Sequence, residues 1–126
     1  MKAKRIILSL ALATIIVVCA AGAYAETLSW NAVTTYTDGS SIGTATVTYT
    51  AVWSTSSSLT SPTTLVSGTS STSATFSIGT AGMPRGSTIY FGVKATVAGV
   101  DSAYSTALSW SVPSLTPSSP GNLRVQ

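Results

Sequence analysis

The chain has 126 residues, of which six are Lys or Arg, three are Asp or Glu, one is Cys and none is His. Half of the positive charges lie within the first five residues, and the rest of the chain balances three cations against three carboxylates. This balance argues against nucleic acid or anionic lipid as a partner, because both require clustered Lys and Arg.

Residues 1–25, which we call the leader, have the pattern of a secretory signal peptide. Basic residues precede an apolar run from Ile6 to Ala21, and Ala23-Tyr24-Ala25 matches the small-x-small pattern of a cleavage site. The run is shorter than the ~20 residues that span a bilayer, so we expect no membrane anchor after leader removal. A lipid anchor at Cys19 is disfavoured, because Val18 is larger than the residue that lipoprotein cleavage sites usually carry there.

Residues 26–126 are predicted to form short strands rather than a disordered, Ser/Thr-rich stalk. Ser and Thr make up about four residues in ten of this part, but apolar residues alternate among them. A period of two is typical of strands, and Thr is a good β-former on a solvent-facing side. The alternating sets are Leu28, Trp30 and Ala32; Val47, Tyr49, Ala51 and Trp53; Ile89, Phe91, Val93, Ala95 and Val97; and Leu108, Trp110 and Val112.

Clusters of turn-forming residues separate these segments. They are Thr37–Ser41, Ser67–Thr69, Gly79–Gly86 and Ala98–Asp101. Short strands between regular turns predict an antiparallel β-sandwich over residues 26–112, followed by a Pro/Ser linker over 113–119. We interpret Asp38-Gly39 as a tight turn rather than a calcium ligand, because no second acid is near in sequence.

In their order and spacing these segments resemble the fibronectin type III domains of secreted bacterial proteins. Thr27–Trp30 is similar to the second strand of that family and Tyr49–Trp53 to the third. Pro84–Thr88 followed by Phe91–Ala95 resembles the turn and sixth strand, and Asp101–Ser105 resembles the entry to the last strand. The resemblance implies an all-β, immunoglobulin-like sandwich on a protein secreted from a bacterial cell or held at its surface.

Two departures from the family pattern are visible in the sequence. The position of the family's corner tyrosine falls on Ile89, and Tyr90 is predicted to point to the opposite face. The family also begins with a Pro-x-x-Leu-x-Val strand that pairs with the Leu-x-Trp strand, whereas here the chain after the leader begins almost directly at Thr27. A segment of that form, Pro120–Val125, stands instead at the back of the chain.

We expect residues 120–126 to act as a donated strand. The linker from Pro113 to Pro120 reaches at most ~26 Å when fully extended, against a sandwich of roughly 30 Å, so self-closure is disfavoured. Donation to the next copy of the chain would generate a head-to-tail extracellular fibre by β-strand addition. The predicted donor residues are Pro120, Asn122, Leu123, Arg124 and Val125, and the predicted acceptor residues are Thr27, Leu28, Ser29, Trp30 and Asn31.

The alternative is a non-polymerising module for cell-surface adhesion or carbohydrate binding, with surface glycans or other cell-surface proteins as partners. An exposed, coplanar set of Tyr36, Tyr90 and Tyr104 would favour it, whereas Trp30 and Trp53 alternate in step with core residues. We expect no enzyme, cofactor or metal, because three scattered carboxylates without His or a retained Cys cannot assemble a catalytic or metal cluster.

Overall fold

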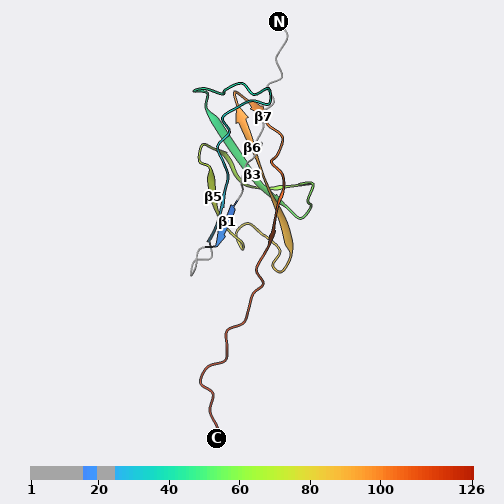
Figure 1. Ribbon diagram of the computed structural model, residues 1–126. Helices are drawn as coiled ribbons and strands as arrows, with labels where there is room; N and C mark the ends of the chain where they lie inside the picture. The colour runs from blue at the N-terminus through green and yellow to red at the C-terminus, as the bar shows by residue number, and fades with distance from the viewer. Residues whose placement is uncertain (1–15, 20–24) are drawn as a thin grey trace.

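The computed structural model describes residues 16–19 and 25–126, and this part of the chain contains eight β-strands and no helix (Figure 1). No helix in these residues is long and apolar enough to cross a membrane. The strands are β1 Ile16–Cys19, β2 Ala25–Ser29, β3 Val47–Ser54, β4 Thr63–Thr69, β5 Ser73–Ser77, β6 Thr88–Val97, β7 Val100–Asp101 and β8 Leu108–Ser111.

The strands form two antiparallel sheets that pack face to face. One sheet has the order β1-β2-β5, and the other has the order β4-β3-β6 with β7 and β8 both paired to β6. The long β3–β6 pair, in register from Val47 opposite Val97 to Ser54 opposite Tyr90, forms the centre of the second sheet. The predicted all-β sandwich is confirmed.

The core lies between the sheets and is rich in aromatic rings. Phe76 of β5 packs against Phe91 of β6 at a centroid distance of 5.3 Å and edge-on against Trp110 of β8 at 5.7 Å. Trp30 and Trp53, both predicted to be core residues, are buried. Such tilted and edge-to-face pairs add to the free energy gained by burying the rings.

One predicted core position is wrong. Ala32 is exposed, and Val33 is buried in its place. The alternation stops because β2 ends at Ser29 and the residues after it are irregular, although the Trp30 N–H still donates to the Thr72 carbonyl oxygen. The backbone N–H of Val33 is anchored to the Tyr49 hydroxyl oxygen, at 2.9 Å.

The structure contains two strands that the alternation did not reveal, β4 and β5. Ser67–Thr69, predicted to be a turn, lies within β4, and the connection to β5 comes after it. Gly68 has φ +69, and the pairing of β4 with β3 shifts register between Tyr49 and Val52. An irregular strand of this kind does not keep a strict period of two.

A small apolar cluster lies on the outer face of the β3–β6 pair. Val52, which alternates with the core residues Ala51 and Trp53, is almost fully buried there, and Leu59, also buried, lies beside Gly92, the residue opposite Val52. Gly92 of β6 makes room for Leu59: a Cβ at Gly92 would lie 2.3 Å from Leu59 Cδ1. Ser54 fixes this loop by donating to the Thr60 carbonyl oxygen at 2.7 Å.

Serine side chains attach the chain between β7 and β8 to the edge of β6. The Ser102 N–H donates to the Ala95 carbonyl oxygen, and the Ala95 N–H donates back to the Ser102 hydroxyl oxygen at 2.9 Å. Ser105 makes the same pair of bonds with Val93. These hydroxyls substitute for backbone carbonyls, so the edge of β6 is covered without a continuous strand.

Candidate functional site

The outer edge of β2, Ala25–Ser29, is the predicted acceptor, and we call it the β2 edge. The sequence predicted it to be open, but in the structure β1 pairs with it in antiparallel register, from Ile16 opposite Ser29 to Cys19 opposite Glu26. The predicted open edge concerns the chain without its leader, and for that form it stays a prediction. β1 belongs entirely to the predicted leader, and β2 begins at Ala25, at the predicted cleavage site.

Side chains alternate along β2 between the core and the outer face. Leu28 and Glu26 point inward and are buried, with 0% and 7% of their surface exposed. Ala25, Thr27 and Ser29 lie on the other face and are half-buried. On a strand that pairs with the β2 edge, the side chains opposite Leu28 and Glu26 therefore face the core, and those opposite Thr27 and Ser29 face outward.

Two predicted acceptor residues lie just beyond β2. Trp30 continues the inward series and is buried against Tyr49, with a ring centroid distance of 5.7 Å. Asn31 lies outside the strand and is exposed. Of the predicted acceptor residues, β2 itself contains Thr27, Leu28 and Ser29, and Glu26, which was not predicted, continues the inward period.

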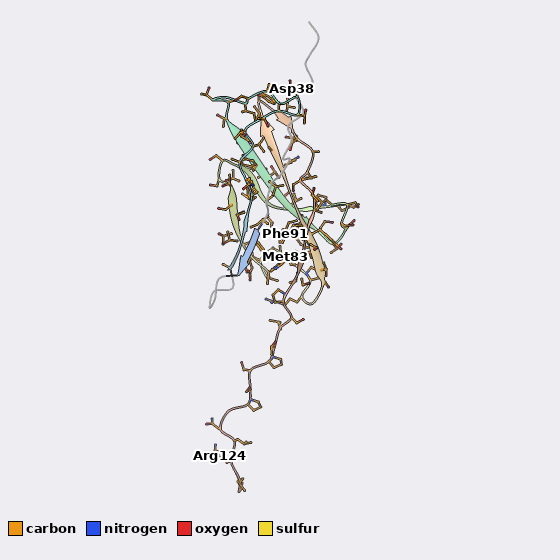
Figure 2. All side chains as sticks on the ribbon, viewed as in Figure 1. Asp38, Met83, Phe91 and Arg124 are labelled. Carbon is orange, nitrogen blue, oxygen red and sulfur yellow. The ribbon has the colours of Figure 1, made fainter. Side chains whose placement is uncertain are left out.

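The last 14 residues, 113–126, which we call the tail, leave the sandwich fully exposed. Leu123 is 97% exposed and Val125 is 100% exposed, whereas Val112 just before the tail is buried. The donor segment is not a strand in the single chain, and Asn122 has φ +54, a conformation that Asn reaches more easily than most residues. Figure 2 shows Arg124 far from the sandwich, near the tip of the tail.

Hydrogen bonds place the exit of the tail at the end of the sandwich where β2 begins. Ala25 at the start of β2 is opposite Ser77 at the end of β5. The turn that follows β5 leads to Gly86, whose N–H donates to the carbonyl oxygen of Val112 at the end of β8. Because β1 is antiparallel to β2, both β1 and β8 run toward this end, and the tail continues in that direction (Figure 1).

A hairpin-like loop lies at the opposite end of the molecule, where Figure 2 labels Asp38. The Asp38 carboxylate accepts from the backbone N–H of Ser40 at 2.9 Å and from the Ser40 hydroxyl. Gly39 has φ +85, and its N–H donates to the Tyr36 carbonyl oxygen. The predicted tight turn is confirmed, and its carboxylate stabilises the turn itself.

The remaining carboxylate, Asp101, is bound within a surface cluster. Thr96 donates to its carboxylate at 2.6 Å and Lys94 at 3.1 Å, and these hydrogen bonds, the Thr96 bond foremost, lower the pKa of Asp101. The Lys94 ammonium also lies 5.6 Å from the centroid of the Tyr104 ring. Within residues 16–19 and 25–126, no three His, Cys, Asp or Glu side chains are grouped to hold a metal ion.

The three tyrosines considered for a sugar-binding platform lie apart. Tyr36 is in the loop at the Asp38 end, whereas Tyr90 lies near the start of β6 at the other end. Tyr104 is on the segment between β7 and β8 and is partly covered by Lys94. Ile89 is fully buried and Tyr90 is on the opposite face, as predicted, so a coplanar aromatic set is not formed by these three rings.

Comparisons with known proteins identify the fold. No protein-family model matches the chain, and no curated protein matches it significantly. An Fn3-like protein from Clostridium thermocellum has a TM-score of 0.56 and 24% identity, covering 82% of this chain and 93% of that one. The fibronectin type III domain of human KIAA0970 has a TM-score of 0.61 and 14% identity, covering 97% and 82%.

A further structure, the sixth fibronectin type III domain of human fibronectin type III domain containing protein 3, gives a TM-score of 0.58 and 19% identity over 85% of this chain and 88% of that domain. These structural similarities establish the fold: the chain is a fibronectin type III-like β-sandwich. In that fold the first strand pairs with the second, and β1 occupies the first-strand place.

Proposed function

We propose that the protein is a secreted bacterial structural subunit that polymerises head to tail into an extracellular fibre. Each copy donates its tail to the β2 edge of the next copy. One observation carries the proposal: within the described residues, the β2 edge is covered only by β1, which lies inside the predicted leader. Leader removal would leave a row of backbone N–H and C=O groups without partners.

The exposure of the tail supports the same function. Leu123 and Val125 are apolar, two residues apart and almost completely exposed, a costly arrangement that docking into a sheet edge would remove. The outer side of the β2 edge carries Thr27 and Ser29 but no Lys, which would blunt an exposed edge. A donor and an acceptor on one chain form a heterologous contact, and such contacts extend into filaments when they do not close into a ring.

The test compares two proteins produced from the full-length gene in a secreting host, with leader removal verified by mass. One protein ends at Gln126 and the other at Pro117, and both are examined by negative-stain electron microscopy and light scattering. We expect filaments only from the longer protein. If both remain folded monomers at high concentration, the polymer is refuted, and the adhesion or carbohydrate-binding module becomes the function to test by glycan screening.

A further inference from the structure

The pairing of β1 with β2 defines a register for any strand that replaces β1. Val17 lies opposite Leu28, and Cys19 lies opposite Glu26. Both β2 side chains face the core, so a replacement strand needs its apolar residues at these two backbone positions. The donor segment Asn122-Leu123-Arg124-Val125 has the required spacing, because Leu123 and Val125 are two residues apart.

We propose that the β2 edge is a strand-exchange site with one fixed register, occupied by residues 16–19 before leader removal and by residues 122–125 of a second copy afterwards. In this register Leu123 lies opposite Leu28 and Val125 opposite Glu26. This inference rests on the proposed function, and it adds the residue pairs of the joint and the role of the leader strand.

The outward-facing positions also fit this register. Asn122 would lie opposite Ser29 and Arg124 opposite Thr27, so polar residues pair with polar residues on the solvent side. A shift by one residue would turn Leu123 and Val125 to the solvent, because side chains alternate with a period of two.

A shift by two residues fails in either direction. One shift places Gly121 opposite Leu28 and leaves that buried position without a side chain to pack against. The other places Leu123 opposite Trp30, beyond Ser29 where β2 ends. The register copied from β1 is the one that fills the edge.

The direction of the tail fits a second copy better than the copy that carries it. A strand on the β2 edge must run like β1, toward the end of the sandwich where the tail leaves. Self-pairing would require the tail to reverse twice within residues 113–121. A second copy further along the same line receives the strand without any reversal, and these nine linker residues reach up to ~30 Å between the two sandwiches.

Disulfide trapping tests the register directly. The chain has one cysteine, Cys19, which leaves with the leader, so introduced pairs have a clean background. Directly opposite residues have Cα atoms ~4.5–5.5 Å apart, within the ~4.4–6.8 Å that a disulfide accepts, whereas residues displaced by two lie beyond it. The matched pair is Thr27→Cys with Arg124→Cys, and the displaced control is Thr27→Cys with Asn122→Cys.

Both double variants are secreted from the full-length gene, oxidised mildly and run on non-reducing gels, with the cross-linked peptides identified by mass spectrometry. We expect a ladder of covalent multimers from the matched pair and at least a ten-fold weaker ladder from the control. Mixing the two single variants, Thr27→Cys and Arg124→Cys, should give a dimer that contains one copy of each.

The alternative outcomes separate the two proposals. Filaments whose ladder is stronger in the displaced pair would overturn the register while leaving strand donation intact. A disulfide formed within one chain, without multimers, would show that the tail closes on its own β2 edge and would overturn both. Absence of filaments and of any cross-link would also overturn both.

A transplanted strand provides the control for the role of the leader. In this variant Asn122-Leu123-Arg124-Val125 replaces Ile16–Cys19, the chain ends at Pro117, and the protein is made without export so that the front strand is retained. We expect a folded monomer that unfolds at a higher temperature than residues 26–117. Equal unfolding temperatures would show that residues 122–125 do not fit the place of β1.

Discussion

The substitution Leu123→Ala separates assembly from folding. Leu123 is 97% exposed in the single chain, so its truncation should leave the stability of the monomer unchanged. In the joint the side chain would be buried opposite Leu28, and about three methylene equivalents at ~0.8 kcal/mol each amount to about 2 kcal/mol. Because each 1.4 kcal/mol is a factor of ten, the critical concentration for assembly should rise roughly thirty-fold.

The chain offers a matched control for this experiment in Leu115→Ala. Leu115 is also in the tail and 75% exposed, but it lies in the linker outside the donated strand. Critical concentrations are measured by light scattering over a dilution series, and monomer stability is measured by thermal unfolding of the same variants on the version ending at Gln126. Equal critical concentrations for Leu123→Ala and Leu115→Ala would refute the burial of Leu123 in the joint.

Three further substitutions test the sandwich itself by equilibrium unfolding. Gly92→Ala should lower the free energy of unfolding by about 1–3 kcal/mol, because the new methyl group displaces Leu59. The loss should be much smaller when Leu59→Ala is already present, and an equal loss in both backgrounds would contradict the contact. Ser102→Ala should lower the free energy of unfolding by about 1–3 kcal/mol, because it leaves the buried Ala95 N–H of β6 without a partner. The control Ser109→Ala, at an exposed position of β8, should leave the free energy nearly unchanged. Similar losses for the two variants would contradict the Ala95–Ser102 hydrogen bond. Folding lowers the pKa of Asp101, so the ionised carboxylate stabilises the folded state, by about 0.2–1 kcal/mol for such an exposed pair. This contribution is present above the unfolded pKa and is lost as the pH falls through the folded pKa. The difference in unfolding free energy between the wild type and Asp101→Asn should therefore shrink below about pH 4.

The centre of the fold was predictable because its apolar period is unbroken. Ile89, Phe91, Val93 and Ala95 alternate over β6 and are all fully buried. β4 was not predicted, because Leu65 and Val66 are adjacent and a bulge interrupts its pairing. Strands of this kind are hard to recognise in a chain so rich in Ser and Thr, because Thr occurs in its strands and in its loops alike.

The sequence predicted which residues belong to the candidate site but not how they are arranged in space. Leu123 and Val125 stand out as a strand pattern in the wrong part of the chain, and Leu28 is an obvious core neighbour. The direction of the tail was not visible in the sequence, because it depends on the pairing of β8 with β6 and on the Gly86–Val112 hydrogen bond. The short linker disfavours self-closure because the tail leaves the sandwich in the direction in which β1 runs.

The strand β1 was missed because one segment satisfies two patterns. Ile16-Val17-Val18 is apolar enough for the core of a secretory leader and β-branched enough for a strand. The first pattern predicts a leader, and the pairing with β2 is not visible in the sequence. In the structure the same residues complete the sheet beside β2.

This double use has a physical consequence for assembly. Under the proposed function, a subunit that still carries residues 16–19 has no open β2 edge, and a subunit from which the leader has been removed would have one. Under the proposed exchange, leader removal therefore converts a closed sandwich into a strand acceptor, while the exposed tail is a donor in both forms. Polymerisation would then begin only after export, where a neighbouring copy can supply the missing strand and where an unpaired edge would otherwise invite aggregation.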